Sequence, residues 1–283
     1  MSTQLCLITC SGFDREILAV QSSPDLQDVR FRVLPVECDQ VESTWPGLDA
    51  AVAACRGNGC PVALAGGYCL TRPAKGLALD GACRLHQKSQ CFEWVAPKEV
   101  VDGLLRDGAL LVLPGWLRDW GSHLDARWPS DRKAAQAFFR ELAGRVVLLD
   151  TGVHPGIERE LKAFSRFLKL PCQTHPVGTG HFELSLARVA QSWRLERERA
   201  ETEDRLAGTL ERAVEQRIQR IARSVRLDGF RPGKAPLRVV RQRFGDQARR
   251  EAYGELIESS FQQAATRENL RVVAQPRIEL KDA

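Results

Sequence analysis

Short apolar runs alternate with amphipathic stretches over the first two thirds of the chain. The apolar runs are bounded by turn residues and predict strands over residues 5–10, 29–36, 61–66, 109–113 and 146–149. Helices are predicted near residues 47–55, 98–106, 131–142 and 156–168. This alternation is typical of an α/β fold with a doubly wound, mostly parallel sheet. Ligands of such folds bind at the carboxyl ends of the strands.

The pattern changes after Trp193. The following stretch, "RLERERAETEDRLAGT", is rich in Arg and Glu and has no period-two alternation, so it predicts a solvated helix. An apolar stripe then recurs at three- and four-residue steps through Leu206, Leu210, Val214, Ile218, Ile221 and Val225. Because the two segments are contiguous, we expect one extended helix. The chain is therefore divided into an α/β domain (residues 1–193), a charged helical linker (194–209) and a mainly helical α+β fragment (210–283).

The C-terminal fragment contains further helical segments. Pro236 predicts the start of a short helix that stops at Gly245. Asp246 is a suitable N-cap for a longer helix that ends near Asn269. A returning strand is predicted over residues 271–280, which leaves the sheet that would cover these helices incomplete.

A stiff turn over residues 229–236 interrupts the helical pattern. Its two glycines and two prolines restrict the backbone to geometries that other residues resist. The turn carries Phe230 and Arg231, with Lys234 just beyond. An exposed aromatic between cations is suited to docking on an anionic or mixed surface. The alternative is a connecting turn whose Phe230 folds back into a local core.

The sequence around this turn is strongly basic. The stretch from Ile221 to Arg250 contains nine basic and two acidic residues, a local excess of seven positive charges. Such a field favours RNA phosphates or an acidic protein surface.

The segment from Leu210 to Glu279 resembles the N-terminal ribosome-binding domain of trigger factor, the bacterial chaperone that meets nascent chains at the exit tunnel. The signature turn of that family is found here as Gly229, Phe230, Arg231, Gly233, Lys234 and Pro236. The resemblance implies that Phe230, Arg231 and Lys234 contact a ribosomal protein and nearby ribosomal RNA. It also implies a part in protein folding and protein transport, with nascent polypeptide as a further partner.

The segment also departs from that family. Where trigger factor has a strand before its first helix, this chain has the Arg- and Glu-rich stretch. Nothing in the sequence resembles the prolyl isomerase domain or the substrate-cradling helical domain. We therefore expect a ribosome-docking tip rather than a complete chaperone, and an enzyme is the less favoured reading.

Composition sets the broad class of the protein. With 43% hydrophobic and 27% charged residues, the chain is expected to be globular. We expect no membrane span, because no apolar run is long enough, and no signal peptide. Nine scattered cysteines fit a reducing cytoplasm better than a disulfide framework.

Several candidate ligand-binding residues follow the predicted strands of the α/β domain. Cys69 lies on a glycine-rich turn after the third strand, and Asp150 and His154 follow the fifth. We expect these three residues to form a ligand site with neighbouring loops. Cys69 and Cys91 are candidate ligands of a metal or a corrinoid, although Cys83, His86 and Cys91 lack the paired spacing of a structural zinc site. The alternative is that these thiols are small buried apolar groups.

Residues 5–193 are also similar to domain-of-unknown-function family sixteen-thirty-eight. The similarity rests on the tyrosine–cysteine turn, the "PGWL" and "DTG" segments after strands, and the closing stretch from Gly180 to Trp193. It implies a domain that binds a small ligand or metallocofactor, a corrinoid or a divalent metal being the first to consider. A gene fusion and an error in gene prediction are both explanations for its pairing with the C-terminal segment.

Three functions from different classes therefore fit the sequence. The leading one is a ribosome-associated, chaperone-related binding module. The second is a small-ligand, corrinoid- or metal-binding sensory domain to which the C-terminal segment is incidental. The third is an enzyme that uses a thiolate at Cys69 or Cys91, which ranks last because no set of nucleophile, base and orienting group can be assembled from the sequence.

Overall fold

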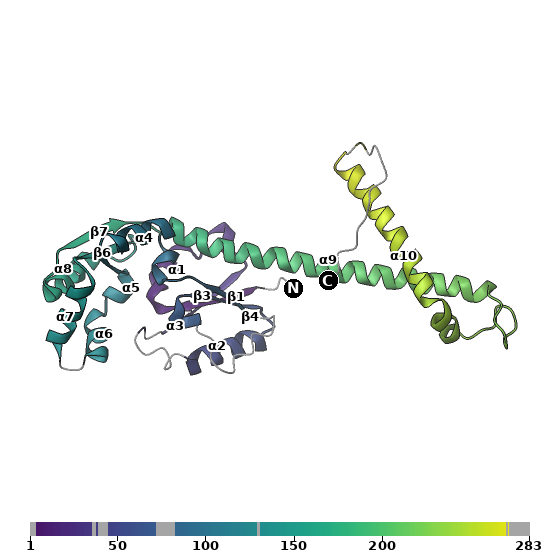
Figure 1. The fold of residues 1–283 in the computed structure, drawn as a ribbon, viewed down its shortest axis with the longest axis horizontal. Coiled ribbons are helices and arrows are strands. Elements are labelled where there is room, and N and C mark those ends of the chain that lie inside the picture. The colour runs from purple at the N-terminus through teal and green to yellow at the C-terminus, as the bar shows by residue number, and fades with distance from the viewer. Residues whose placement is uncertain are drawn as a thin grey trace. The chain divides into compact units, whose positions relative to one another are not determined.

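The computed structural model describes residues 4–35, 38, 45–71, 83–128, 131–269 and 271. The chain divides into two compact units, Met1–Leu195 and Glu196–Ala283, each with its own core (Figure 1). In the part of the chain that is described, no helix is long and apolar enough to cross a membrane.

The first unit contains a four-stranded parallel sheet. Its strands are β1 (Leu5–Cys10), β2 (Val29–Leu34), β3 (Val62–Gly66) and β4 (Cys83–Gln87), in the order β2-β1-β3-β4. Every residue of the central strands β1 and β3 is buried. Both faces of the sheet are therefore covered, as the continuous apolar runs of these strands predict.

A second parallel sheet follows in the same unit. It consists of β5 (Ala109–Val112), β6 (Arg145–Asp150) and β7 (Cys172–Pro176), with β6 in the centre. Side chains of β6 and of the helix after it, including Leu148, Leu161 and Phe164, are buried in one apolar cluster. This packing explains why the apolar runs of β5 and β6 form strands.

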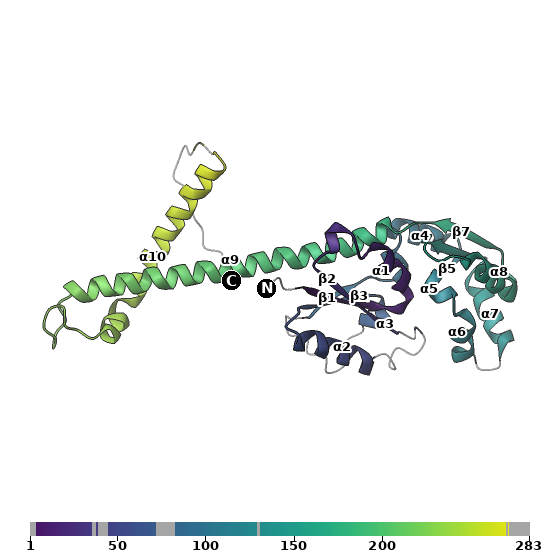
Figure 2. The same ribbon diagram turned by 180° about the vertical axis from the view of Figure 1, so that it is seen from behind.

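Helices cover the faces of the two sheets. The first unit contains α1 (Asp14–Val20), α2 (Trp45–Gly57), α3 (Tyr68–Thr71), α4 (Lys98–Arg106), α5 (Pro114–Leu117), α6 (Trp120–Arg127), α7 (Arg132–Leu142) and α8 (Ile157–Leu168), with 3₁₀ turns η1 (Ser11–Phe13), η2 (Pro24–Leu26) and η4 (Cys91–Trp94). α1 covers one face of the four-stranded sheet and α2 the other (Figures 1 and 2). Apolar residues of α1 belong to the cluster on the first face and those of α2 to the cluster on the second.

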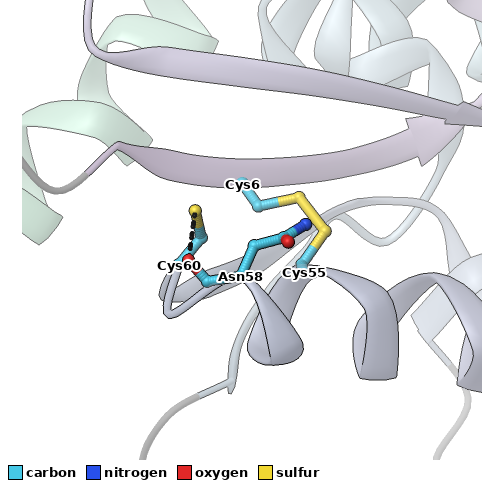
Figure 3. The surroundings of a disulfide bond; sticks show 4 residues. All are labelled: Cys6, Cys55, Asn58 and Cys60. Atoms are coloured by element: carbon cyan, nitrogen blue, oxygen red, sulfur yellow. Dashed lines mark hydrogen bonds between the residues drawn. A yellow bond between two sulfur atoms is a disulfide. The ribbon is translucent and has the colours of Figure 1, made fainter.

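A disulfide joins a strand to a helix in this unit. Cys6 of β1 is bonded to Cys55 of α2, with 6.3 Å between their Cα atoms (Figure 3). The Cys60 thiol lies nearby, 3.8 Å from the Asn58 carbonyl oxygen. All nine cysteines lie in the described residues, and the other seven form no disulfide there. The expectation of thiols without disulfide bonds is thus corrected for one pair, because α2 packs on the face of the sheet that carries Cys6 and so brings two distant cysteines together.

The predicted α/β class with parallel sheets is confirmed. The strands are divided between two sheets, and β4 and β7 were not predicted. Both lie at sheet edges and are rich in polar residues that are at least partly exposed, such as Arg84 and Gln173. Such strands are not predicted from continuous apolar runs, because a strand at the edge of a sheet needs to bury little apolar surface.

The predicted extended helix is also present. α9 runs from Gly180 to Ser224 over 45 residues. Its first turns are anchored in the core of the first unit by buried Phe182, Leu186 and Trp193. The charged stretch beyond Trp193 is largely exposed and carries ion pairs one turn apart, such as Arg199 with Glu203 at 2.8 Å.

The second unit pairs the end of α9 with α10 (Leu237–Arg267). Ile218 and Val240 are fully buried in its small core, where Ala248 and Leu227 join them. Ion pairs support the contact. The Arg217 side chain lies 2.8 Å from a carboxylate oxygen of Glu251 and 2.6 Å from one of Glu255.

One helix boundary in this unit was predicted wrongly. The sequence suggested a short helix that stops at Gly245 and a second that starts at Asp246, whereas α10 passes through both residues. A glycine inside a helix costs about 1 kcal/mol relative to alanine, which is too little to end a helix whose flanking residues pack. Val240 and Ala248 provide that packing on either side. The strand predicted over residues 271–280 lies almost entirely outside the described residues.

Candidate functional site

The connection between α9 and α10 (residues 225–236, here called the docking loop) is shaped by two glycines. Gly229 has φ 85° and Gly233 has φ 72°, both in the left-handed region. For residues other than glycine this backbone conformation is unfavourable in free energy, so glycine suits both positions. The local sequence therefore dictates the path of the loop.

Short-range contacts fold the loop back onto the end of α9. The Phe230 N–H donates to the Leu227 carbonyl at 3.0 Å, and the Lys234 N–H donates to the Arg231 carbonyl at 2.9 Å. At Gly233 an added Cβ would lie 2.9 Å from the Arg223 carbonyl oxygen. The backbone thus approaches the helix end more closely than a side chain permits.

The tip of the loop presents the three side chains that the sequence singled out. Phe230 is 40% exposed, and Arg231 and Lys234 are also exposed. Neither cation forms an ion pair with a described residue. The apolar anchor of the loop is Leu227, which is buried, so the alternative of Phe230 in a local core is not observed. The aromatic ring and both cations are available to a partner.

The surrounding charge is also largely unneutralised. Of the nine basic residues between Ile221 and Arg250, Arg241 alone has an ion-pair partner among the described residues, the carboxylate of Glu215. Pro236 completes the loop, because its extended backbone (ψ 139°) forms the N-cap of α10. The six signature residues Gly229, Phe230, Arg231, Gly233, Lys234 and Pro236 therefore form one continuous element.

The first unit contains a cavity of about 400 Å³. It lies where the carboxyl ends of β1 and β5 meet η4 and α5, as expected for ligand sites in α/β folds. The wall is mostly apolar and includes Phe13, Leu113 and Trp116, whose ring stacks on His123 with centroids 5.1 Å apart. Arg118 also lines the cavity and lies 3.1 Å from the Asp14 carboxylate.

The predicted ligand residues do not gather at this cavity. Cys91 lines it, whereas Cys69, Asp150 and His154 are absent from its described wall. Cys69 follows β3 of the first sheet, and Asp150 ends β6 of the second. Asp150 instead accepts a hydrogen bond from the Gly152 N–H at 2.9 Å. Their roles as ligands stay predictions.

His154 belongs to a buried polar group in the first unit. Its Nε2 lies 3.0 Å from Glu16 Oε1, which also accepts a hydrogen bond from the Thr151 hydroxyl at 2.7 Å. All three side chains are buried. The group joins α1 to the segment after β6, so it ties the two sheets together.

Thiols form a second cluster, at the carboxyl edge of the four-stranded sheet. Cys69 accepts hydrogen bonds from Cys38 and Cys91, which lower the pKa of its thiol to about 3. The same contact with Cys69, together with burial, raises the pKa of Cys91. Burial, with the neighbouring Cys69, raises the pKa of Cys10 to about 12. Cys69 and Cys91 were predicted from the sequence, whereas Cys10 and Cys38 were not; the signal common to these two is a position at or just after a strand.

Comparison with known proteins gives matches to the second unit. A family model described as "Bacterial trigger factor protein (TF)" matches residues 205–283. Trigger factor of Azoarcus sp. (strain BH72) is 50% identical over 74 residues, and that of Aromatoleum aromaticum is 45% identical over 74 residues. Trigger factor of Hydrogenovibrio crunogenus is 43% identical over 76 residues.

These matches cover limited parts of both chains. They include 26–27% of this chain and 17% of the length of each relative. No solved structure matches the chain significantly. The similarity of the C-terminal segment to trigger factor is thus established, whereas the similarity of residues 5–193 to domain-of-unknown-function family sixteen-thirty-eight stays a prediction.

Proposed function

We propose that this protein associates with the bacterial ribosome through the docking loop and takes part in protein folding and protein transport. The observation that carries the proposal is the exposed tip, which presents Phe230 together with Arg231 and Lys234, two cations that have no ion-pair partner among the described residues. The trigger factor match over residues 205–283 includes this tip. The proposed setting is the cytoplasm, where bacterial ribosomes translate.

The three side chains have distinct roles in the proposed contact. Phe230 supplies the apolar contact with the partner, because an aromatic side chain that becomes buried contributes most of the binding energy of a small interface. Arg231 binds a carboxylate or phosphate through two parallel hydrogen bonds, and Lys234 adds a point charge. The proposed partners are a ribosomal protein at the tunnel exit, adjacent ribosomal RNA and, when it emerges, nascent polypeptide.

Co-sedimentation with purified ribosomes tests this proposal. The triple variant Phe230→Ala, Arg231→Ala, Lys234→Ala should lose most of the binding of the unmodified chain. Because phosphate contacts release counterions, binding of the unmodified chain should weaken as salt rises.

A matched control separates the docking loop from general charge. The variant Arg205→Ala, Tyr253→Ala, Arg267→Ala also removes one exposed aromatic and two cations from the second unit. It should sediment like the unmodified chain. Equal binding by both triple variants would show that the loop does not direct the association.

We also propose, as a second function, that the first unit binds a small ligand. The specific support is the cavity of about 400 Å³, a volume within the range of small-molecule sites. Its stacked Trp116 and His123 favour a planar apolar molecule over a whole corrinoid. A screen of melting temperature with the full chain and with Trp116→Ala tests this; a ligand that stabilises both proteins equally would place the binding elsewhere.

A further inference from the structure

Four cysteines converge from consecutive parts of the four-stranded sheet. Cys10 ends β1, Cys38 follows β2, Cys69 lies in α3 after β3, and Cys91 begins η4 after β4. Because parallel strands place their carboxyl ends at one edge, residues far apart in sequence meet there. The contact between Cys69 and its two thiol neighbours is the result.

The backbone favours the approach of Cys91 to the turn that carries Cys69. An added Cβ at Gly67 would lie 2.4 Å from the Cys91 sulfur. Only a residue without a side chain therefore lets the Cys91 thiol lie against the β3–α3 turn. Cys69 follows Gly67 by two residues.

Three members of this cluster lie at the cavity of the first unit. Cys10, Cys38 and Cys91 all line its wall, and both Cys38 and Cys91 donate hydrogen bonds to Cys69. Cys69 itself is 8% exposed, so a reagent that modifies it must be small. The described residues contain no group of three or more histidine, cysteine or carboxylate side chains that is arranged to hold a metal ion.

We propose that Cys69 and Cys91 form a peroxide-sensitive dithiol site. The Cys69 thiolate attacks one oxygen of hydrogen peroxide, the O–O bond breaks, and a sulfenic acid and hydroxide result. Cys91 then gives its proton to that hydroxide and attacks the Cys69 sulfur. The new S–S bond expels the sulfenic oxygen, which leaves as water after taking up a proton. One peroxide and two thiols thus yield one disulfide and two waters.

The chemistry of the two thiols supports this order of steps. A hydrogen-bonded thiolate is the more reactive partner, and a neighbouring protonated thiol is suited to resolve the sulfenic acid. The lowered pKa of Cys69 and the raised pKa of Cys91 agree with these roles. The site is separate from the docking loop and independent of ribosome binding.

Peptide mapping by mass spectrometry tests the site in the full chain. The protein is treated with hydrogen peroxide after mild reduction, and the Cys6–Cys55 pair is followed separately. We expect a Cys69–Cys91 disulfide and the loss of two free thiols per chain. In Cys69→Ser and Cys69→Ala the remaining thiol, Cys91, should stay reduced, whereas Cys172→Ser, which changes a thiol in β7, should behave like the unmodified chain.

A trapping experiment identifies the first sulfur to react. In Cys91→Ser the resolving thiol is gone, so dimedone should label Cys69 as a sulfenic acid. Far-UV circular dichroism checks that each variant is folded. Three results would overturn the proposal: oxidation of Cys172 before Cys69, a disulfide from Cys69 to Cys38, or zinc or iron in the purified chain that is lost on Cys69→Ser.

Discussion

At the scale of single residues, the docking loop depends on two glycines whose surroundings differ. Both have left-handed backbone, but nothing described lies within 4 Å of an added Cβ at Gly229. At Gly233 the same atom would meet the Arg223 carbonyl oxygen at 2.9 Å. Gly229 is therefore needed for conformation alone, whereas Gly233 is needed for conformation and for space.

This difference predicts an order of effects. Gly229→Ala should cost about 1–2 kcal/mol of loop stability through its backbone angle. Gly233→Ala should cost more, because the backbone atom that it meets cannot turn away. Titration of ribosomes with each variant should show weaker binding for Gly233→Ala than for Gly229→Ala. The same affinity for both would mean that the loop does not hold the described shape on the ribosome.

At the scale of elements, local signals predicted some features and long-range packing decided others. The turn chemistry of residues 229–236 is local, so the sequence placed Phe230, Arg231 and Lys234 at an exposed tip. The cavity could not be predicted in this way, because its wall joins Cys10, Leu113 and Trp116 from different sheets and helices. Likewise, the packing of Val240 and Ala248 carries α10 through Gly245, against the helix-ending tendency of glycine.

The continuity of α10 can be measured. Gly245→Ala should stabilise the second unit by about 0.5–1 kcal/mol, because an added Cβ would meet only Arg241 Cγ at 3.8 Å and alanine favours a helix. Gly254→Ala, with open space around it, is the matched control and should stabilise by a similar amount. Thermal melts followed by circular dichroism provide the comparison. Stabilisation by Gly254→Ala alone would indicate a break in the helix at Gly245.

At the scale of the whole molecule, we propose that the α/β domain (residues 1–193) and the trigger-factor-like segment (210–283) are separate domains joined by the charged helical linker (194–209). The core residues of the two units do not overlap. The alternation of apolar runs with amphipathic stretches predicted the α/β class of the first unit. The edge strands β4 and β7 were not predicted because they are polar.

Domain-specific spectroscopy tests this division. All six tryptophans precede residue 194, so tryptophan fluorescence reports on the first unit. Phe182→Ala should destabilise that unit by about 3–5 kcal/mol and shift its fluorescence melt. Ile218→Ala, which removes a fully buried side chain from the other core, should shift the helical signal and leave the fluorescence melt in place. Coincident shifts in both signals would show one cooperative domain.

Photo-crosslinking from position 230 tests the central claim, ribosome docking by this loop, most directly. A photo-reactive phenylalanine analogue replaces Phe230 in one protein and Tyr253, an exposed aromatic on α10, in another. We predict that position 230 crosslinks to a ribosomal protein at the tunnel exit and that position 253 yields far less product. The same crosslinks from both positions, or none from position 230 when the chain co-sediments with ribosomes, would contradict docking through the loop.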